Sequence, residues 1–395
     1  MLFRIFKIVQ FYSLLAIFYV LERFTPKSPQ YWCFTTWSNY AHTMDNPRAI
    51  FEQIKNNPQI CKVILQSIDN RNERGSLPDA INTKFVREKS LAGAYYLARS
   101  KVVIIATSLA GFSHYSKFMS NRHQIIQLWH GIPLKRIGKL FPPETFWQYE
   151  TDKYAATVCS SAQDKVYMQK AFAPIPSDRV WQTGLPRNDL ILKKEAHLPD
   201  DYKSHLNSIR ARLKGRKMVL YAPTWRLDES STYCFSKIEL EVLKKILDKH
   251  NAVLAFRGHA NVRTRAIFDP EFNDVINVND IPDANILLRL ADVLVTDYSS
   301  IYIDFLITSK PIIYFAYDKE NYVSERGFLY PLEEAYVDDD VSDVEGLALK
   351  LDEALSDGVS DPARYDTVTS LFHDYNGASA PDVCDNIKVL AGTKG

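Results

Sequence analysis

Short apolar runs separated by longer polar or amphipathic stretches are the main pattern of the chain. The runs of the first half are CKVILQ (61–66), KVVIIAT (101–107), HQIIQLWH (123–130) and AATVCSS (155–161). They are β-branched and continuous rather than alternating, which is typical of strands buried on both faces of a parallel sheet. Helices are expected between them, for example in VREKSLAGAYYLARS (86–100).

The second half of the chain repeats this pattern. Its runs are KMVLYAPT (217–224), AVLAFRGH (252–259), DVINVND (274–280), ADVLVTDYSS (291–300) and PIIYFA (311–316). Helical stretches such as KIELEVLKKILDKH (237–250) and IPDANILLRLA (281–291) lie between them. Two successive β/α series predict an α/β protein with two Rossmann-like domains and a cleft between them.

A polar and charged stretch at 192–217 separates the two series. Such a composition is typical of a linker that leads into a surface helix. We therefore expect an N-terminal helix at 1–30, a first domain at 31–205 and a second domain at 206–395.

The first 24 residues, MLFRIFKIVQFYSLLAIFYVLERF, are strongly apolar. Their uninterrupted part, 11–21, is shorter than the roughly 20 residues that a membrane span needs, and no small-residue cleavage site of a signal peptide follows. An interfacial helix on the cytoplasmic membrane face is predicted, with basic residues near anionic headgroups. The alternative is a first helix packed on the protein's own core. The polar positions that interrupt or flank the segment are Arg4, Lys7, Gln10, Arg23 and Lys27.

Composition narrows the class of protein. Of the 395 residues, 46% are hydrophobic and 24% charged, which indicates folded domains rather than disorder. A net charge of +1 argues against a broad nucleic-acid-binding surface, so anion binding has to be local. The five cysteines show no C-x-x-C spacing and are expected to be reduced thiols in the cytoplasm. No metal-ligand spacing occurs, and the DDD run at 338–340 is expected to be a solvated loop.

Candidate chemistry is sought where strands end, because open α/β sheets bind ligands at the carboxyl ends of their strands. In the first series, WHGIPLK places His130 and Lys135 after a strand, followed by Arg136 and Lys139. Histidine is the natural general base near neutral pH. The segment therefore suggests a catalytic histidine beside an anion site, and the alternative is a turn that leads into a solvated helix.

Three strand ends of the second series also carry polar residues. They are LYAPTWR, AFRGHA and VTDYSSIYIDF, and a later loop adds Arg326. A hydroxyl-rich helix start can bind phosphate through its backbone N–H groups, although each polar residue could simply cap the helix. Neither a dinucleotide fingerprint nor a P-loop is present, so hydroxyls, backbone and arginines would hold a phosphate. The candidates are Thr224, Arg226, Arg257, His259, Thr296, Asp297, Ser299, Ser300, Asp304 and Arg326.

Five motifs in order resemble one known family. They are WHGIPLKRIG, YAPTWR, FRGHA, VTDYSSIYIDF and PIIYFAYDKENYVSERGFLY, within residues 127–330. This set is similar to the CDP-glycerol:poly(glycerophosphate) glycerophosphotransferases, the teichoic-acid primases and polymerases and their capsule relatives. The resemblance implies a GT-B-like fold, no metal and no cofactor beyond the CDP-polyol substrate, and a peripheral position on the inner face of the cell membrane.

The resemblance also implies roles for single residues. His130 would be the acid–base histidine, and His259 a second essential histidine at the donor phosphates. Thr296, Ser299 and Ser300 would hold the pyrophosphate, assisted by Arg326 and by Arg257 or Arg226. One departure concerns His259: the family usually has Arg-x-His-Pro where this chain has RGHA, with Ala260 in the proline position.

The function implied by the resemblance is transfer of glycerol phosphate, or a related polyol phosphate, with release of CMP. The expected partners are CDP-glycerol or CDP-ribitol, a lipid-linked or capsular glycan acceptor and the anionic inner membrane surface, without nucleic acid. Two alternatives stay open. One is a GT-B glycosyltransferase that uses a nucleotide sugar, and the other is a non-catalytic protein that binds a nucleotide or a glycan.

Overall fold

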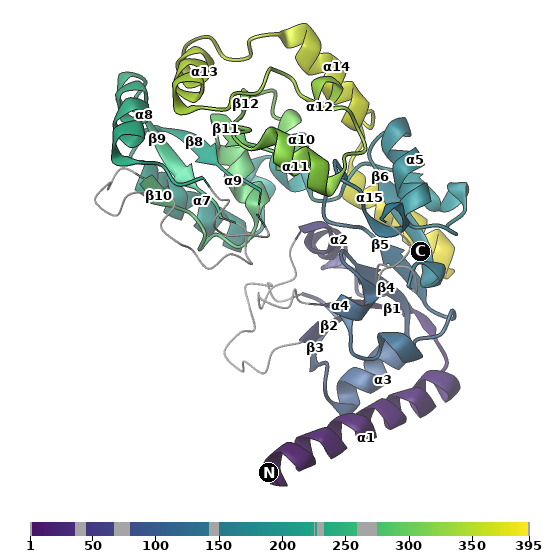
Figure 1. Cartoon of the computed structure of the whole chain (residues 1–395). Helices are drawn as coiled ribbons and strands as arrows, with labels where there is room; N and C mark the ends of the chain where they lie inside the picture. The colour runs from purple at the N-terminus through teal and green to yellow at the C-terminus, as the bar shows by residue number, and fades with distance from the viewer. Residues whose placement is uncertain are drawn as a thin grey trace. The chain divides into compact units, whose positions relative to one another are not determined.

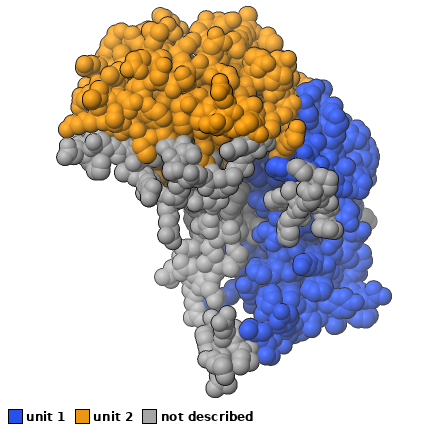
Figure 2. Space-filling model, viewed as in Figure 1, with its two compact units in different colours: residues 1–130, 137–189, 375–395 blue, residues 131–136, 190–374 orange. Residues whose placement is uncertain are grey.

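A computed structural model describes most of the chain, and the chain divides into two compact units (Figure 2). The described residues are 2–35, 45–66, 80–141, 150–224, 226, 233–258 and 275–393, with only the backbone described at 2–7, 35, 325 and 326. Unit 1 comprises residues 1–130, 137–189 and 375–395, and unit 2 comprises residues 131–136 and 190–374. These units differ from the expected domains: the main boundary follows residue 189, residues 131–136 belong to unit 2, and both the N-terminal helix and the C-terminal residues belong to unit 1.

Unit 1 is built on a seven-stranded parallel sheet of order β3-β2-β1-β4-β5-β6-β7 (Figure 1). Its strands are β1 (Ser28–Thr35), β2 (Cys61–Gln66), β3 (Thr83–Arg87), β4 (Ser100–Ile105), β5 (Gln124–Gln127), β6 (Tyr154–Cys159) and β7 (Val180–Gln182). Its helices are α1 (Leu2–Phe24), α2 (Asp45–Ile54), α3 (Leu91–Arg99), α4 (Leu109–Phe112), α5 (Ala162–Ala171) and α15 (Ser379–Ala391), and α6 (Asn188–Leu192) spans the boundary to unit 2.

Unit 2 is built on a five-stranded parallel sheet of order β10-β9-β8-β11-β12. Its strands are β8 (Lys217–Tyr221), β9 (Ala252–Phe256), β10 (Val275–Asn277), β11 (Val293–Thr296) and β12 (Ile312–Tyr314). Its helices are α7 (Asp200–Leu213), α8 (Lys237–Lys249), α9 (Ala284–Leu290), α10 (Ile301–Leu306), α11 (Lys319–Arg326), α12 (Leu332–Ala335), α13 (Val344–Asp357) and α14 (Pro362–Phe372). The expected α/β architecture with two series of parallel strands is confirmed.

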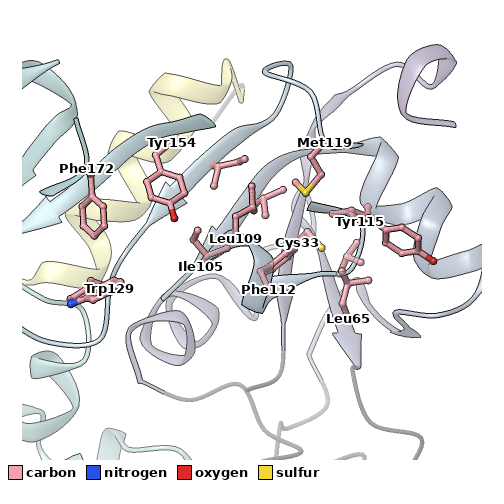
Figure 3. Close-up of a cluster of buried hydrophobic side chains, with 14 of the residues drawn as sticks. Cys33, Leu65, Ile105, Leu109, Phe112, Tyr115, Met119, Trp129, Tyr154 and Phe172 are labelled. Carbon is pink, nitrogen blue, oxygen red and sulfur yellow. The ribbon is translucent and has the colours of Figure 1, made fainter. Parts of the chain in front are cut away.

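The apolar runs of unit 1 form the buried interior strands of its sheet. Each apolar run became a central strand, because its side chains are buried on both faces, as at Val103 and Ile104, both 0% exposed. Strand β1 lies inside the sheet between β2 and β4, and its Trp32 pairs with Lys62 of β2 and Val102 of β4. Figure 3 shows the apolar cluster that packs on one face of this sheet, from Tyr115 and Cys33 at one end to Trp129 and Phe172 at the other.

Helix α1 packs against α3 and contributes to the core of unit 1 (Figure 1). Phe18 is 0% exposed and stacks on Tyr115 with ring centroids 4.5 Å apart. Among the described side chains of α1, the exposed large apolar ones are Ile8, Val9, Tyr12, Ile17, Tyr19, Val20 and Phe24. Within the described part of the chain, no helix is long and apolar enough to cross a bilayer.

Lys27 lies just beyond α1 and was expected to face a membrane, but its side chain is buried. Its side chain is 6% exposed and its Nζ lies 2.6 Å from Glu22 Oε2. His123 Nε2 lies 3.0 Å from the same carboxylate oxygen, and Ser120 Oγ donates to Glu22 Oε1. The ammonium is therefore part of a buried polar cluster that joins α1 to the segment before β5.

Candidate active site

The turn that carries His130 follows directly on β5. Gln127, the last residue of this strand, is buried, and its side-chain amide donates to Thr107 O at 2.8 Å. Its Oε1 accepts the Trp129 N–H at 2.9 Å. Trp129 has a φ of +52°, a left-handed conformation that is strained for a bulky residue. The turn therefore needs partners that hold it in place.

The hydrogen bond of the His130 ring defines its tautomer. Nδ1 lies 2.8 Å from the carbonyl oxygen of Ala106. A carbonyl oxygen only accepts, so Nδ1 carries the proton and the basic lone pair of the neutral imidazole is on Nε2. The ring stacks on Trp129 with centroids 4.2 Å apart, and the Trp129 indole packs in turn against Phe172 (Figure 3).

The surroundings of His130 favour the neutral ring. The residue keeps exposed surface, but partial burial of its ring lowers the pKa of His130 below its ordinary value of 6.5. The Ala106 carbonyl and the Asp45 carboxylate oppose this shift, and the Arg187 guanidinium adds to it. The net direction is downward, so His130 is a neutral base at physiological pH.

Two residues that the sequence analysis did not single out hold the backbone of this turn. Asn46 Nδ2 donates to Leu128 O and Trp129 O at 3.2 and 3.0 Å. Arg187 Nη1 donates to His130 O at 2.7 Å. Arg187 follows β7, a strand of three residues that its short run VWQ does not reveal. The signal that the sequence carries for Arg187 is its place in the segment after this strand.

Lys135 was expected to lie beside His130 at a strand end of the first series, and the structure places it elsewhere. The chain passes from unit 1 to unit 2 between His130 and Gly131, and Lys135 belongs to unit 2. Its Nζ donates to Tyr322 OH at 3.0 Å, and its backbone forms an antiparallel bridge with Phe328. This bridge is possible because the segment 131–136 runs beside the loop that follows α11.

Arg226 lies at the centre of a buried polar cluster in unit 2. It is 4% exposed, and its Nη2 lies 2.9 Å from Asp297 Oδ2. Its Nε and Nη2 also donate to the two carboxylate oxygens of Asp318 at 2.7 and 2.9 Å. The guanidinium carbon lies 4.6–5.3 Å from the ring centroids of three tyrosines, Tyr298, Tyr317 and Tyr322. The arginine fork is thus engaged by the protein itself.

The end of β11 combines buried and accessible polar groups. Thr296 is 0% exposed and its hydroxyl donates to Ala222 O at 2.7 Å. Asp297 is 1% exposed and accepts the Thr224 N–H at 2.7 Å. Ser299 and Ser300, directly before α10, are only partly buried. Thr296 and Asp297 therefore hold the loop after β8, while the two serines keep accessible surface.

The remaining candidates are placed less centrally or lie outside the described residues. Asp304 is 2% exposed within α10. The guanidinium of Arg257 donates to backbone carbonyls that follow β10, including Val278 O at 3.3 Å. Arg326 is the last residue of α11, and its side chain is outside the described part. His259 also lies outside the described residues.

The acidic run at 338–340 is paired with basic side chains. Asp338 accepts from Lys350, Asp339 from Arg364 and Asp340 from Lys319. Among the residues that the structure describes, no three histidine, cysteine or acidic side chains are grouped as metal ligands. The chemistry that the described groups offer is a neutral imidazole with a basic Nε2 in unit 1, and partly exposed hydroxyls at a helix start in unit 2.

The chain is similar to several known proteins. A family model for CDP-Glycerol:Poly(glycerophosphate) glycerophosphotransferase matches residues 17–388. A teichoic acid glycerol-phosphate transferase of Staphylococcus aureus (strain NCTC 8325 / PS 47) is 31% identical over 305 residues, which are 72% of this chain and 74% of that protein. The teichoic acid ribitol-phosphate polymerase TarK of the same organism is 33% identical over 219 residues, 53% of this chain and 42% of that protein.

Solved structures of the wall teichoic acid polymerase TagF have the same fold. One gives a TM-score of 0.76 at 23% identity and covers 99% of this chain and 97% of that chain. A TagF variant soaked with CDPG gives a TM-score of 0.74 at 24% identity, covering 93% of this chain and 90% of that chain. These likenesses confirm the expected GT-B-like α/β fold.

Proposed function

The chain belongs to the CDP-glycerol:poly(glycerophosphate) glycerophosphotransferase family, and from this premise we propose that it transfers a polyol phosphate from a CDP-polyol to a hydroxyl group of a lipid-linked or capsular glycan. Glycerol phosphate is the first candidate for the transferred group, and ribitol phosphate is the second because of the similarity to TarK. The observation that carries the proposal is the His130 imidazole, whose Nδ1 donates to Ala106 O and leaves Nε2 as the basic nitrogen.

The reaction assigned to this site is an in-line displacement at phosphorus. The oxygen of the acceptor hydroxyl forms a bond to the β-phosphorus of the CDP-polyol, and the bond from that phosphorus to the bridging oxygen breaks. CMP leaves with the bridging oxygen, and the hydroxyl proton moves to His130 Nε2. A lowered pKa of His130 suits this step, because the ring is neutral and ready to accept the proton at physiological pH.

The donor pyrophosphate carries negative charge that the protein has to stabilise. Without a metal, backbone N–H groups, hydroxyls and basic side chains supply this stabilisation. Ser299 and Ser300 are candidates because their surface is accessible at the start of α10. Arg326 and His259 stay candidates from the family motif. Arg226 and Thr296 act here by holding the loops, since both side chains bond to other parts of unit 2.

The test of the function is release of CMP from a defined donor. Purified full-length protein is incubated with a lipid-linked glycan acceptor and either CDP-glycerol or CDP-ribitol, and CMP and product mass are measured. We expect turnover with one of the two donors, and a loss of about 10²–10⁴-fold in His130→Gln, the range typical of a lost general base. His250→Gln is the control, since His250 pairs with Asp352 on the surface of unit 2.

Three outcomes would contradict the proposal. Turnover only with nucleotide sugars would instead assign a glycosyltransferase. Binding of CDP-polyol without turnover by the unaltered protein would assign a binding protein. Unchanged turnover in His130→Gln would remove the base from the mechanism while leaving the activity in place.

A peripheral position at the inner membrane face is also part of this proposal. The exposed apolar side chains of α1 support it, together with the basic Arg23 at the last turn of this helix. We expect the protein to co-sediment with vesicles that contain anionic lipid, and the double variant Tyr12→Ser, Tyr19→Ser to bind them several-fold less. The control is Ile238→Ser, which removes a 79% exposed apolar residue from α8. Equal sedimentation of all three proteins would exclude α1 as the attachment site.

A further inference from the structure

The backbone of the His130 turn is held at three consecutive carbonyl groups. Leu128 O and Trp129 O accept from Asn46 Nδ2, and His130 O accepts from Arg187 Nη1. The middle residue, Trp129, is in the left-handed conformation, which persists in proteins only where the surroundings enforce it. Hydrogen bonds from outside the turn therefore determine the direction in which the His130 side chain leaves the backbone.

The side chain of Asn46 is dedicated to this turn. It is 0% exposed at the start of α2. Its Nδ2 makes the two bonds to the turn, and its Oδ1 accepts the backbone N–H of Arg187 at 2.9 Å. One amide thus joins the His130 turn to the residue that holds the next carbonyl. A side chain needed only to stabilise α2 would not have its bonds directed to this turn and to Arg187.

Arg187 is held in place from its other side by Asp45. Arg187 Nη1 lies 3.2 Å from both carboxylate oxygens of Asp45, and the two side chains are 11% and 17% exposed. Asp45 is itself left-handed, with a φ of +63°. The guanidinium is therefore pinned between a carboxylate and the carbonyl of His130, where it fixes the backbone and adds a positive charge close to the ring.

We propose that Asn46 and Arg187 are positioning residues for His130, which keep its Nδ1 on the carbonyl of Ala106 and its Nε2 as the basic nitrogen. The proposal rests on the proposed function in one respect, because it takes His130 as the base. Among the described residues, the charged groups that act on the ring include Asp45, at the start of α2, and Arg187, before α6. Asp45 raises the pKa of His130 and Arg187 lowers it.

The kinetic test compares Asn46→Ala, Arg187→Met and Arg187→Lys with Thr151→Val. Thr151 is 2% exposed in unit 1, and its hydroxyl donates to Ala173 O at 2.7 Å instead of to a carbonyl of the turn. We expect kcat to fall about 100-fold in Asn46→Ala and Arg187→Met, as for a misplaced catalytic group, with an unchanged KM for the CDP-polyol. Arg187→Lys keeps the charge and recovers part of kcat, and Thr151→Val keeps all of it.

The pH profile separates positioning from a purely structural role. Loss of Arg187 removes a positive charge that lowers the pKa of His130, so the acid limb of the kcat profile moves to higher pH in Arg187→Met. It moves back toward that of the unaltered protein in Arg187→Lys. A loss of folding alone would lower kcat without moving this limb. Thermal unfolding of each variant identifies any that fails to fold.

A second readout does not depend on activity. The protein has nine histidines, and long-range 15N–1H spectra of the 15N-histidine-labelled full chain report the tautomer of each, with His130→Gln identifying the His130 signal. We expect Nδ1-protonated His130 in the unaltered protein and a mixture of tautomers in Asn46→Ala and Arg187→Met. An Nε2-protonated ring in the unaltered protein, or an unchanged tautomer and kcat in both variants, overturns the inference.

The two readouts distinguish failure of this inference from failure of the proposed function. If no CDP-polyol is turned over, the function fails, and the tautomer of His130 still decides the positioning. If the unaltered protein turns over a CDP-polyol and His130→Gln does not, the function stands, and the variants of Asn46 and Arg187 decide the positioning.

Discussion

Arg226 is a buried cation on which the polar cluster of unit 2 depends. Its guanidinium is 4% exposed between two carboxylates, Asp297 and Asp318, and three tyrosine rings. Burial alone would lower its pKa, but the hydrogen bonds and charges of Asp318 and Asp297 raise it instead. The charge is therefore permanent, and its removal would leave two carboxylates without their cation inside unit 2.

We expect Arg226→Met to destabilise unit 2 by about 3–5 kcal/mol, the cost of breaking a buried ion pair from one side. Hydrogen exchange of β8 and β11, measured by mass spectrometry, would rise accordingly. The matched control is Arg212→Met, which removes a partly exposed pair with Asp280 and should cost at most about 1 kcal/mol. Equal exchange in the two variants would mean that the Arg226 cluster contributes no more than a surface pair.

At the residue scale, the sequence identified side chains by type and by their place after a strand. His130 was found because imidazole chemistry is recognisable and the run before it is long. Asn46 and Arg187 were not found, because their role lies in hydrogen bonds to backbone carbonyls far along the chain. Arg226 was identified as a polar residue at a strand end, but only the structure shows that carboxylates and tyrosines surround it.

At the scale of elements, α1 is joined to the rest of unit 1 by a buried cluster of titratable side chains with shifted pKa values. Burial alone would raise the pKa of Glu22, but His123, Lys27 and Ser120 lower it from 4.5 to about 2. Burial lowers the pKa of His123 below 6.5 and that of Lys27 to about 8. Lys27 is protonated in both the folded and the unfolded chain well below pH 8, so of these three groups only Glu22 and His123 change the stability as the pH falls into the acid range.

Both His123 and Glu22 make the folded protein less stable as the pH falls. As the pH falls below 6.5, the unfolded chain protonates His123 before the folded one, so stability decreases. As it falls from 4.5 toward about 2, the stabilisation from Glu22 is lost in the same direction. At neutral pH the shift of Glu22 corresponds to about 3 kcal/mol.

We therefore expect Glu22→Gln to be less stable than the unaltered protein by about 3 kcal/mol at pH 7, with the difference shrinking toward zero near pH 2. Urea unfolding at a series of pH values measures it. Glu195→Gln serves as control, since Glu195 forms a solvent-exposed pair with Arg210 and should show little difference at any pH. A pH-independent difference for Glu22→Gln would show that the carboxylate charge is not the stabilising feature.

Elements with long aliphatic runs were predicted well, and those without them were missed. CKVILQ coincides with β2, and α8 spans nearly all of its predicted stretch. The interior strand β1 was missed because SPQYWCFT contains proline and aromatic residues in place of a β-branched run. Its Trp32, Cys33 and Phe34 are nevertheless 0% exposed, because strands on both sides and helices on both faces enclose them.

At the scale of the whole molecule, the last helix returns to the first unit. Helix α15 packs against α2, β4 and β5, with Val383, Cys384 and Ile387 buried. Asp189 Oδ1 and Oδ2 accept the backbone N–H groups of Ser379 and Ala380 at 3.0 and 2.8 Å. The C-terminal residues thus pack on α2, the helix that begins with Asp45 and Asn46.

We expect Ile387→Ala to destabilise unit 1 by about 2–5 kcal/mol, as for a fully buried aliphatic side chain. Hydrogen exchange should accelerate in β4 and β5, while β8 and β9 of unit 2 keep their protection. Val389→Ala is the control on the same helix, since Val389 is 83% exposed. Faster exchange in β8 and β9 instead would contradict the assignment of α15 to unit 1.

The division of the chain was the part of the fold that the sequence indicated least. A linear series of β/α segments suggests one boundary, at the polar stretch. The structure has two further crossings, around residues 131–136 and after residue 374. The amino-acid composition indicates neither crossing. The first depends on the backbone bridge between Lys135 and Phe328. The second depends on α15, whose apolar face is like that of the other helices that pack on a sheet.

Helix α1 also bears on how this protein can be produced and shortened. Apolar N-terminal segments such as α1 are often removed to improve expression. A chain cut before Ser28 would lose Phe18 from its stack on Tyr115 and the Glu22 carboxylate from His123 and Ser120. The shortened protein would uncover apolar surface beside a buried imidazole, so solubility is better sought by replacing the outward side chains of α1 than by removing the helix.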